Sequence, residues 1–242
     1  MASTGDSIIS CNANIFIMEQ DVSKVEMSAF IGVLLAAAGG TSLAGILYTI
    51  QGNFKPLMNK LYFCLGLCLM LWSFGLAVQT TGANASIRFI GSRIAPIGYC
   101  LMFAFLLHYV LLITHGNRPI HKRWLYPLIY LPGLIAVFGL SLWPAIMRLP
   151  DTMLHTNFGW VNISSNGWVN FYYCYYLAFF AAIMLLLWNW GKKTNQMNEK
   201  KQAHLLLLSM LAAIVFGFIT DVGLALLEIS MPGIAFIFSA FP

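Results

Sequence analysis

The chain has 242 residues, of which 60% are hydrophobic and only 9% are charged. A soluble domain has about 25% charged residues, so this composition excludes an ordinary soluble protein and indicates an integral membrane protein that has the lipid bilayer as its partner. The 13 Lys and Arg residues outnumber the 8 Asp and Glu residues. In a membrane protein such an excess orients the chain in the bilayer, so we expect no nucleic-acid partner.

Six stretches are apolar and long enough to cross a bilayer, which takes about 20 helical residues. They are residues 28–50, 61–81, 87–114, 125–147, 168–190 and 205–227. A seventh apolar segment runs from Met231 to Pro242. As a helix it covers about 18 Å, which is short of the hydrocarbon core of about 30 Å. The predicted fold is an all-α polytopic membrane helix bundle with six complete transmembrane helices and a truncated seventh.

Charge in the connections predicts the orientation of this bundle. The loops at 51–60, 115–124 and 191–204 carry nine Lys and Arg residues, and the opposite side carries four. Because basic loops stay in the cytoplasm, the N-terminus is expected outside. Residues 1–27 are polar and lack the pattern of a cleavable signal peptide. We expect them to form an extracytoplasmic segment, partly ordered at best, ahead of a transmembrane domain over residues 28–242.

Small residues and prolines mark individual spans. The first span is rich in Ala and Gly between Ala36 and Gly45, which predicts close packing on a neighbouring helix. Pro96 is expected to kink the third span, because a proline lacks one backbone donor. The fourth span should be interrupted by its three prolines, Pro127, Pro132 and Pro144.

The third span organises the predicted bundle because it carries polar side chains at helical spacing. Arg93, Ile97, Cys100, Ala104 and His108 recur every three or four residues and therefore share a stripe. An arginine below the membrane surface costs about 2.5 kcal/mol or more unless it is paired or hydrated. This stripe is therefore expected to face protein or a cavity, away from lipid.

Two acids in the C-terminal part are candidate partners for the arginines. Asp221 and Glu228 should lie at the outer end of the sixth span, at depths that match Arg93 and Arg88 in the third. One hypothesis is two stacked ion pairs, Arg93 with Asp221 and Arg88 with Glu228. The alternative is that these charges meet water in an outer vestibule and do not touch. A pair becomes functional if a ligand competes for one partner.

Aromatic residues gather at the same outer boundary. Trp160, Trp168, Tyr172 and Tyr176 fit either an ordinary aromatic belt or the wall and lid of an external pocket. Tyr172 and Tyr176 are four residues apart and share a helix face, which suits a pocket wall. The candidate ligand-binding or switch residues are Arg88, Arg93, Tyr99, Asp221, Glu228, Trp160, Trp168, Tyr172 and Tyr176.

Nothing in the sequence predicts catalysis, a metal or a cofactor. Cys64 and Cys68 share a helix face, but no further thiol or imidazole stands near them in sequence. The histidines are sparse, and no nucleophile or nucleotide-binding motif occurs. No complete span contains a lysine that could hold retinal as a Schiff base.

The order of these spans and a few loose motifs resemble a family of bacterial sensors. Trp72-Ser73-Phe74-Gly75 lies in the second span, and Arg88 to Tyr109, with Pro96, makes up most of the third. Lys201-Gln202-Ala203 leads into the sixth span, and Met231-Pro232 stands at the start of the seventh. Residues 28–242 are similar to the seven-helix N-terminal sensor region of histidine kinases, which is sometimes joined to diguanylate cyclase outputs instead.

The resemblance implies a sensory input domain in the bacterial inner membrane, without catalysis of its own. Such a domain would detect a small external or membrane-borne ligand and relay helix movement to a cytoplasmic output domain absent from this chain. It would form a homodimer, if at all, through that output. The alternative is a small-solute transporter or channel subunit, which predicts paired half-repeats with matching Gly and Pro breaks.

Overall fold

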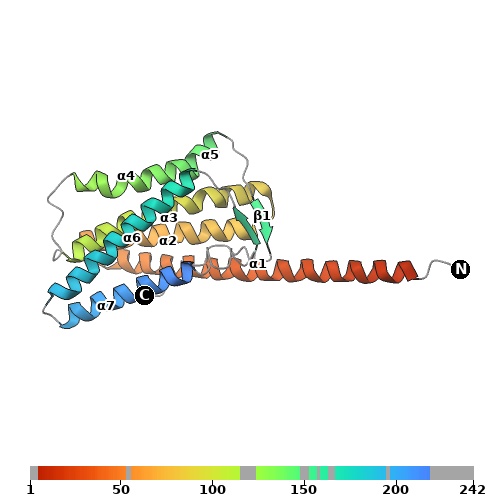
Figure 1. The fold of residues 1–242 in the computed structure, drawn as a ribbon, viewed down its shortest axis with the longest axis horizontal. Helices are drawn as coiled ribbons and strands as arrows, with labels where there is room; N and C mark the ends of the chain where they lie inside the picture. Colours follow the sequence, from red (N-terminus) through yellow and green to blue (C-terminus); the bar gives the residue numbers. More distant parts are fainter. Residues whose placement is uncertain are drawn as a thin grey trace.

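The computed structural model describes residues 5–52, 56–114, 124–147, 153–156, 159–162, 167–194 and 197–218, with most side chains described from residue 27 onward. Seven α-helices, one π-helical segment and a two-stranded hairpin make up this part of the chain (Figure 1). In chain order they are α1 (Gly5–Gln51), α2 (Leu57–Thr81), α3 (Ala85–Thr114), α4 (Leu125–Val137), η1 (Phe138–Leu142), α5 (Trp143–Ile146), β1 (Met153–Thr156), β2 (Gly159–Asn162), α6 (Gly167–Lys193) and α7 (Met197–Phe218).

The predicted helical membrane bundle is confirmed for the described residues. Five stretches are long and apolar enough to cross a membrane: Met27–Gln51, Leu57–Thr81, Ala85–Thr114, Leu125–Ile146 and Gly167–Lys193. They match the first five predicted spans within a few residues. The described part of α7 contains a shorter apolar stretch, Ala203–Ala212. The rest of the predicted sixth span and the whole seventh lie outside the described residues.

The polar N-terminal segment continues the first span as helix. We expected it to be partly ordered at best, but α1 begins at Gly5 and runs to Gln51 without a break. In Figure 1 its N-terminal part projects past the rest of the bundle. Residues 6–26 contain neither proline nor glycine. A helix nucleated in the apolar span can therefore propagate into them at one hydrogen bond per residue.

Glycines let α2 and α3 approach until their backbones touch. A Cβ atom added at Gly75 would lie 2.5 Å from the backbone nitrogen of Ala95, and one at Gly91 would lie 2.5 Å from that of Gln79. Packing through small residues is the usual way in which helices associate in lipid. The predicted close packing of the first span is confirmed in the same way, since a Cβ at Gly39 would meet the Phe74 ring at 3.1 Å.

The predicted inward stripe of the third span is also confirmed. Cys100, Ala104 and His108 are buried, and Arg93 and Ile97 are half-buried. Their helix, α3, contributes to three of the four apolar clusters of the bundle. It therefore occupies the centre of the described structure.

A small antiparallel hairpin closes one end of the bundle, in the connection between α5 and α6. In its register Met153 pairs with Asn162 and Thr156 pairs with Gly159. Figure 1 shows it at the end where α2 finishes and α3 begins. Gly159 has a φ of 112° and lies so close to α2 that an added Cβ would be 2.9 Å from the Thr80 carbonyl oxygen. Glycine is favoured there for both reasons.

Candidate functional site

Arg88 connects the start of α3 to the hairpin. Its Nη1 donates hydrogen bonds to the carbonyl oxygens of Gly82 and Ala83 at 3.1 and 3.3 Å. The guanidinium lies over the Trp160 ring, 3.9 Å from the ring centroid. A cation on an indole face is stabilised by the ring quadrupole. The Trp160 carbonyl in turn accepts a hydrogen bond from Gln79 Nε2 at 3.5 Å, so α2, α3 and β2 meet around this arginine.

Arg93 and the π-helical segment exchange two hydrogen bonds. Arg93 Nη1 donates to the Leu140 carbonyl oxygen at 3.3 Å, and Ser141 Oγ donates to the Arg93 carbonyl oxygen at 2.7 Å. The guanidinium also lies 4.6 Å from the centroid of the Phe89 ring. These contacts give the half-buried guanidinium a carbonyl acceptor and an aromatic ring inside the bundle, as its position in an apolar span requires. We refer to the reciprocal contact between Arg93 and η1 as the Arg93 clamp.

Pro144 explains why the carbonyl of Leu140 can accept a hydrogen bond from a side chain. In an α-helix this carbonyl would bond to the N–H of residue 144, which is Pro144 and has none. The proline ring would also clash with that carbonyl, and a wider preceding turn avoids the clash. The expected interruption of the fourth span is therefore found before Pro144 as a π-turn. At Pro127 and Pro132, by contrast, α4 continues as helix.

Trp168 packs directly on this wide turn. A Cβ atom added at Gly139 would overlap the Trp168 indole, so the ring lies against the bare backbone of η1. The Phe138 ring is 6.4 Å away from it, centroid to centroid. Trp168 thus contacts the fourth span at the level of the Arg93 clamp.

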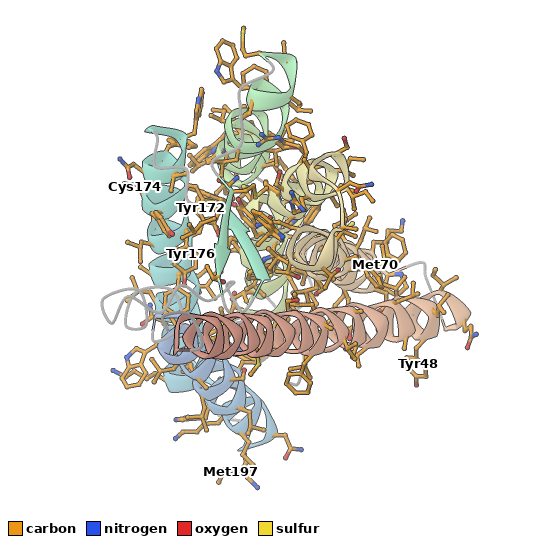
Figure 2. The ribbon with its side chains drawn as sticks, turned by 90° about the vertical axis from the view of Figure 1, so that its right-hand side faces the viewer. Tyr48, Met70, Tyr172, Cys174, Tyr176 and Met197 are labelled. Carbon is orange, nitrogen blue, oxygen red and sulfur yellow. The ribbon has the colours of Figure 1, made fainter. Side chains whose placement is uncertain are left out.

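Tyr99, Tyr172 and Tyr176 form an aromatic cluster between α3 and α6. The Tyr99 and Tyr172 ring centroids are 4.9 Å apart, and Tyr172 stacks on Tyr176 at 6.2 Å. Trp72 of α2 completes the cluster, 6.0 Å from Tyr99. Figure 2 shows Tyr172 and Tyr176 on the side of α6 that faces the bundle, with Cys174 pointing away from it. The two tyrosines share a face as predicted, and that face packs on protein.

The structure therefore groups the candidate residues in three places. Arg88 lies with Trp160 at the hairpin, Arg93 and Trp168 lie on η1, and the three tyrosines lie together between α3 and α6. Asp221 and Glu228 lie outside the described residues. The ion pairs Arg93 with Asp221 and Arg88 with Glu228 therefore remain predictions.

Several polar contacts escaped the sequence analysis. His108 Nδ1 and the Tyr130 hydroxyl are 2.7 Å apart, and the Tyr175 hydroxyl donates to the Cys100 carbonyl oxygen at 2.9 Å. Each contact joins α3 to a neighbouring helix. The signal that could have found them is a hydroxyl or imidazole inside an apolar span, which needs an internal partner. Within the described ranges, no three His, Cys, Asp or Glu residues lie close enough to hold a metal ion.

A comparison with family models decides the family. The model described as the N-terminal 7TM region of histidine kinase matches residues 33–242. The chain belongs to this family. Neither a curated protein nor a solved structure matches it. As a member of the histidine kinase 7TM family with five apolar spans among its described residues, it is a multi-pass membrane protein of the sensor type.

Proposed function

We propose that this chain is a sensory input region of the bacterial inner membrane, with its N-terminus outside. It detects a small ligand at its outer end or from within the bilayer, and it relays helix movement to a cytoplasmic output region that follows residue 242. Membership in the histidine kinase 7TM family supports the sensory role. The nine basic residues on one set of loops support the orientation. Kinase activity would belong to the output region.

The observation that carries the proposal is the Arg93 clamp. A π-helical segment such as η1 holds one extra residue in a wide helical turn, and such segments occur frequently at functional sites. Arg93 and Ser141 hold the turn through one hydrogen bond in each direction. A different register of α4 beside α3 would break both bonds together. We propose that this broken state is the second arrangement of the clamp, because a relay requires an element with two discrete arrangements.

The energies involved suit a switch. Hydrogen bonds between helices in a bilayer are worth about 0.6 kcal/mol on average and up to about 1.7 kcal/mol. Breaking two such bonds costs at most a few kcal/mol, so the alternative register is less stable than the observed one by about that free energy. A ligand that binds one register more tightly by about 1.4 kcal/mol changes their ratio tenfold.

Arg88 places a detection point on the same helix. It lies five residues before Arg93, which is about 7.5 Å along the helix axis. Its contacts with the Trp160 ring and with the turn at Gly82 tie the hairpin to α3. A ligand that engages Arg88, or that competes with Glu228 for it, would shift α3 along or about its axis. Because Arg93 is on the same helix, that shift would change the hydrogen bonds of the Arg93 clamp.

The test is a fusion protein in which residues 1–242 precede a histidine kinase catalytic core, reconstituted into vesicles. Arg93→Gln should change basal autophosphorylation at least about threefold, because it removes a contact that differs between the two registers. Lys192→Gln is the matched control, since Lys192 also lies 4.6 Å from the centroid of an aromatic ring, that of Trp188, but at the C-terminal end of α6. Equal autophosphorylation in the wild type and in both variants would contradict the relay. Solute flux through vesicles that contain the isolated chain would favour the transporter alternative instead.

A further inference from the structure

A hollow of about 500 Å³ opens beside the first turn of α3. It is lined by Ala85, Ser86, Arg88, Phe89, Ile90 and Met153. Its volume is within the range of about 300 to 1,000 Å³ that small-molecule sites occupy. Met153 belongs to β1, so the hollow lies between α3 and the hairpin.

One end of the hollow is cationic and preorganised. The Gly82 and Ala83 carbonyls hold Nη1 of Arg88, and the Trp160 ring covers one face of the guanidinium. A guanidinium offers five donors in a planar fork that fits a carboxylate or phosphate. The first turn of α3 adds the positive end of a helix dipole and contains no acidic side chain.

The rest of the lining is mainly apolar and lies beside exposed aliphatic side chains of α3. Phe89, Ile90 and Met153 form this part of the lining. Ile90 is 54% exposed and its neighbour Ile87 is 42% exposed. On a transmembrane helix, exposed aliphatic side chains contact acyl chains. The lining of the hollow therefore combines one cation with apolar side chains that neighbour exposed aliphatic residues of α3.

We infer that this hollow binds an anionic amphiphile. Its carboxylate or phosphate would pair with Arg88, and its hydrocarbon chain would lie along Phe89, Ile90 and Met153. A free fatty acid and an anionic phospholipid share this chemistry. The inference rests on the proposed function only where it takes this amphiphile to be the ligand to which the sensor responds.

The experiment measures amphiphile binding to the isolated, delipidated chain in neutral detergent by native mass spectrometry. The probes are oleate and phosphatidylglycerol, with phosphatidylcholine as the uncharged comparison. The wild type should retain one molecule of an anionic probe. Arg88→Gln should weaken that binding at least about tenfold, because a hydrogen bond to a charged group is worth about 1.5 to 3 kcal/mol. Lys192→Gln removes a cation from another indole and should leave the affinity unchanged.

A second variant guards against a folding defect in the first. Ser86→Phe keeps Arg88 and fills the hollow with a ring from its exposed rim. It should also lose the anionic probe, while circular dichroism shows an unchanged helix content. Tighter binding of oleate than of phosphatidylglycerol would support a fatty-acid ligand, and the reverse order would support a phospholipid.

Two results would overturn the inference. One is equal binding of both anionic probes to Arg88→Gln and to the wild type. The other is an equal loss of binding in Lys192→Gln, which would indicate unspecific attraction of anions. The measurement needs no output region. A negative binding result would therefore not contradict the proposed relay, and a negative result with the fusion protein would not contradict binding of the amphiphile.

Discussion

The contact between α2 and α3 predicts a large effect for a single methyl group at Gly98. A Cβ atom there would lie 2.6 Å from the Trp72 backbone nitrogen and still closer to the Cys68 carbonyl oxygen. Ordinary contacts of a Cβ begin at 3.4 Å. Gly98→Ala must therefore push the helices apart by more than 0.8 Å, the difference for the Trp72 nitrogen alone, since backbone atoms cannot rotate away. Overpacking of this kind costs about 1 to 3 kcal/mol, and we expect the upper half of that range.

The control is the same Gly-to-Ala substitution at a position where the added methyl group faces open space. A Cβ at Gly40 of α1 would meet no atom within 4 Å. Gly40→Ala should therefore be neutral or stabilise the helix by up to about 1 kcal/mol. The assay is unfolding of the chain in mixed micelles with increasing SDS, followed by circular dichroism. Gly98→Ala should unfold at a clearly lower SDS fraction than Gly40→Ala. Coincident unfolding curves would refute the close approach of α2 and α3.

Two further substitutions test contacts that hold the bundle and its hairpin. Tyr175→Phe removes the hydroxyl that donates to the Cys100 carbonyl and should lower the free energy of unfolding by about 0.5 to 1.5 kcal/mol. In the same SDS assay Tyr48→Phe, at a side chain that is 81% exposed, should cost nothing, and equal curves for the two variants would contradict the prediction. Gly159→Ala places a side chain at a φ of 112° and within 2.9 Å of the Thr80 carbonyl, so strain of about 1 to 3 kcal/mol should loosen the hairpin. Limited proteolysis should then cut the connection between α5 and α6 faster, and an unchanged cleavage rate would count against the hairpin geometry.

The sequence predicted the features that depend on the bilayer as solvent. Hydropathy located the first five spans, because each must satisfy its backbone within one helix of about 20 residues. The i, i+3/i+4 spacing of Cys100, Ala104 and His108 identified the buried face of α3, because residues at this spacing share one face of a helix. These features need no knowledge of the neighbouring helices.

The features that the sequence missed depend on neighbours. Pro144 predicted an interruption of the fourth span, but the sequence did not predict that it is a π-helical segment bonded to Arg93 of another helix. The strands β1 and β2 have four residues each, too few for a reliable pattern, and they are stable only as a pair placed on α1 and α2. For Arg93 the sequence suggested a carboxylate partner. The structure shows a backbone carbonyl as one of its partners, and no side-chain pattern could have predicted that.

The central claim is that the Arg93 clamp holds α3 and the fourth span in one of two registers. Its most direct test is a pulsed electron paramagnetic resonance distance in nanodiscs, between keto-reactive spin labels at unnatural residues that replace Ile87 of α3 and Ile146 of α5. Both positions are exposed, at 42% and 64%, so the labels should not disturb packing. The account predicts that Arg93→Gln shifts the distance distribution to a second population and that Lys192→Gln does not. One unchanged distribution in all three proteins would contradict it.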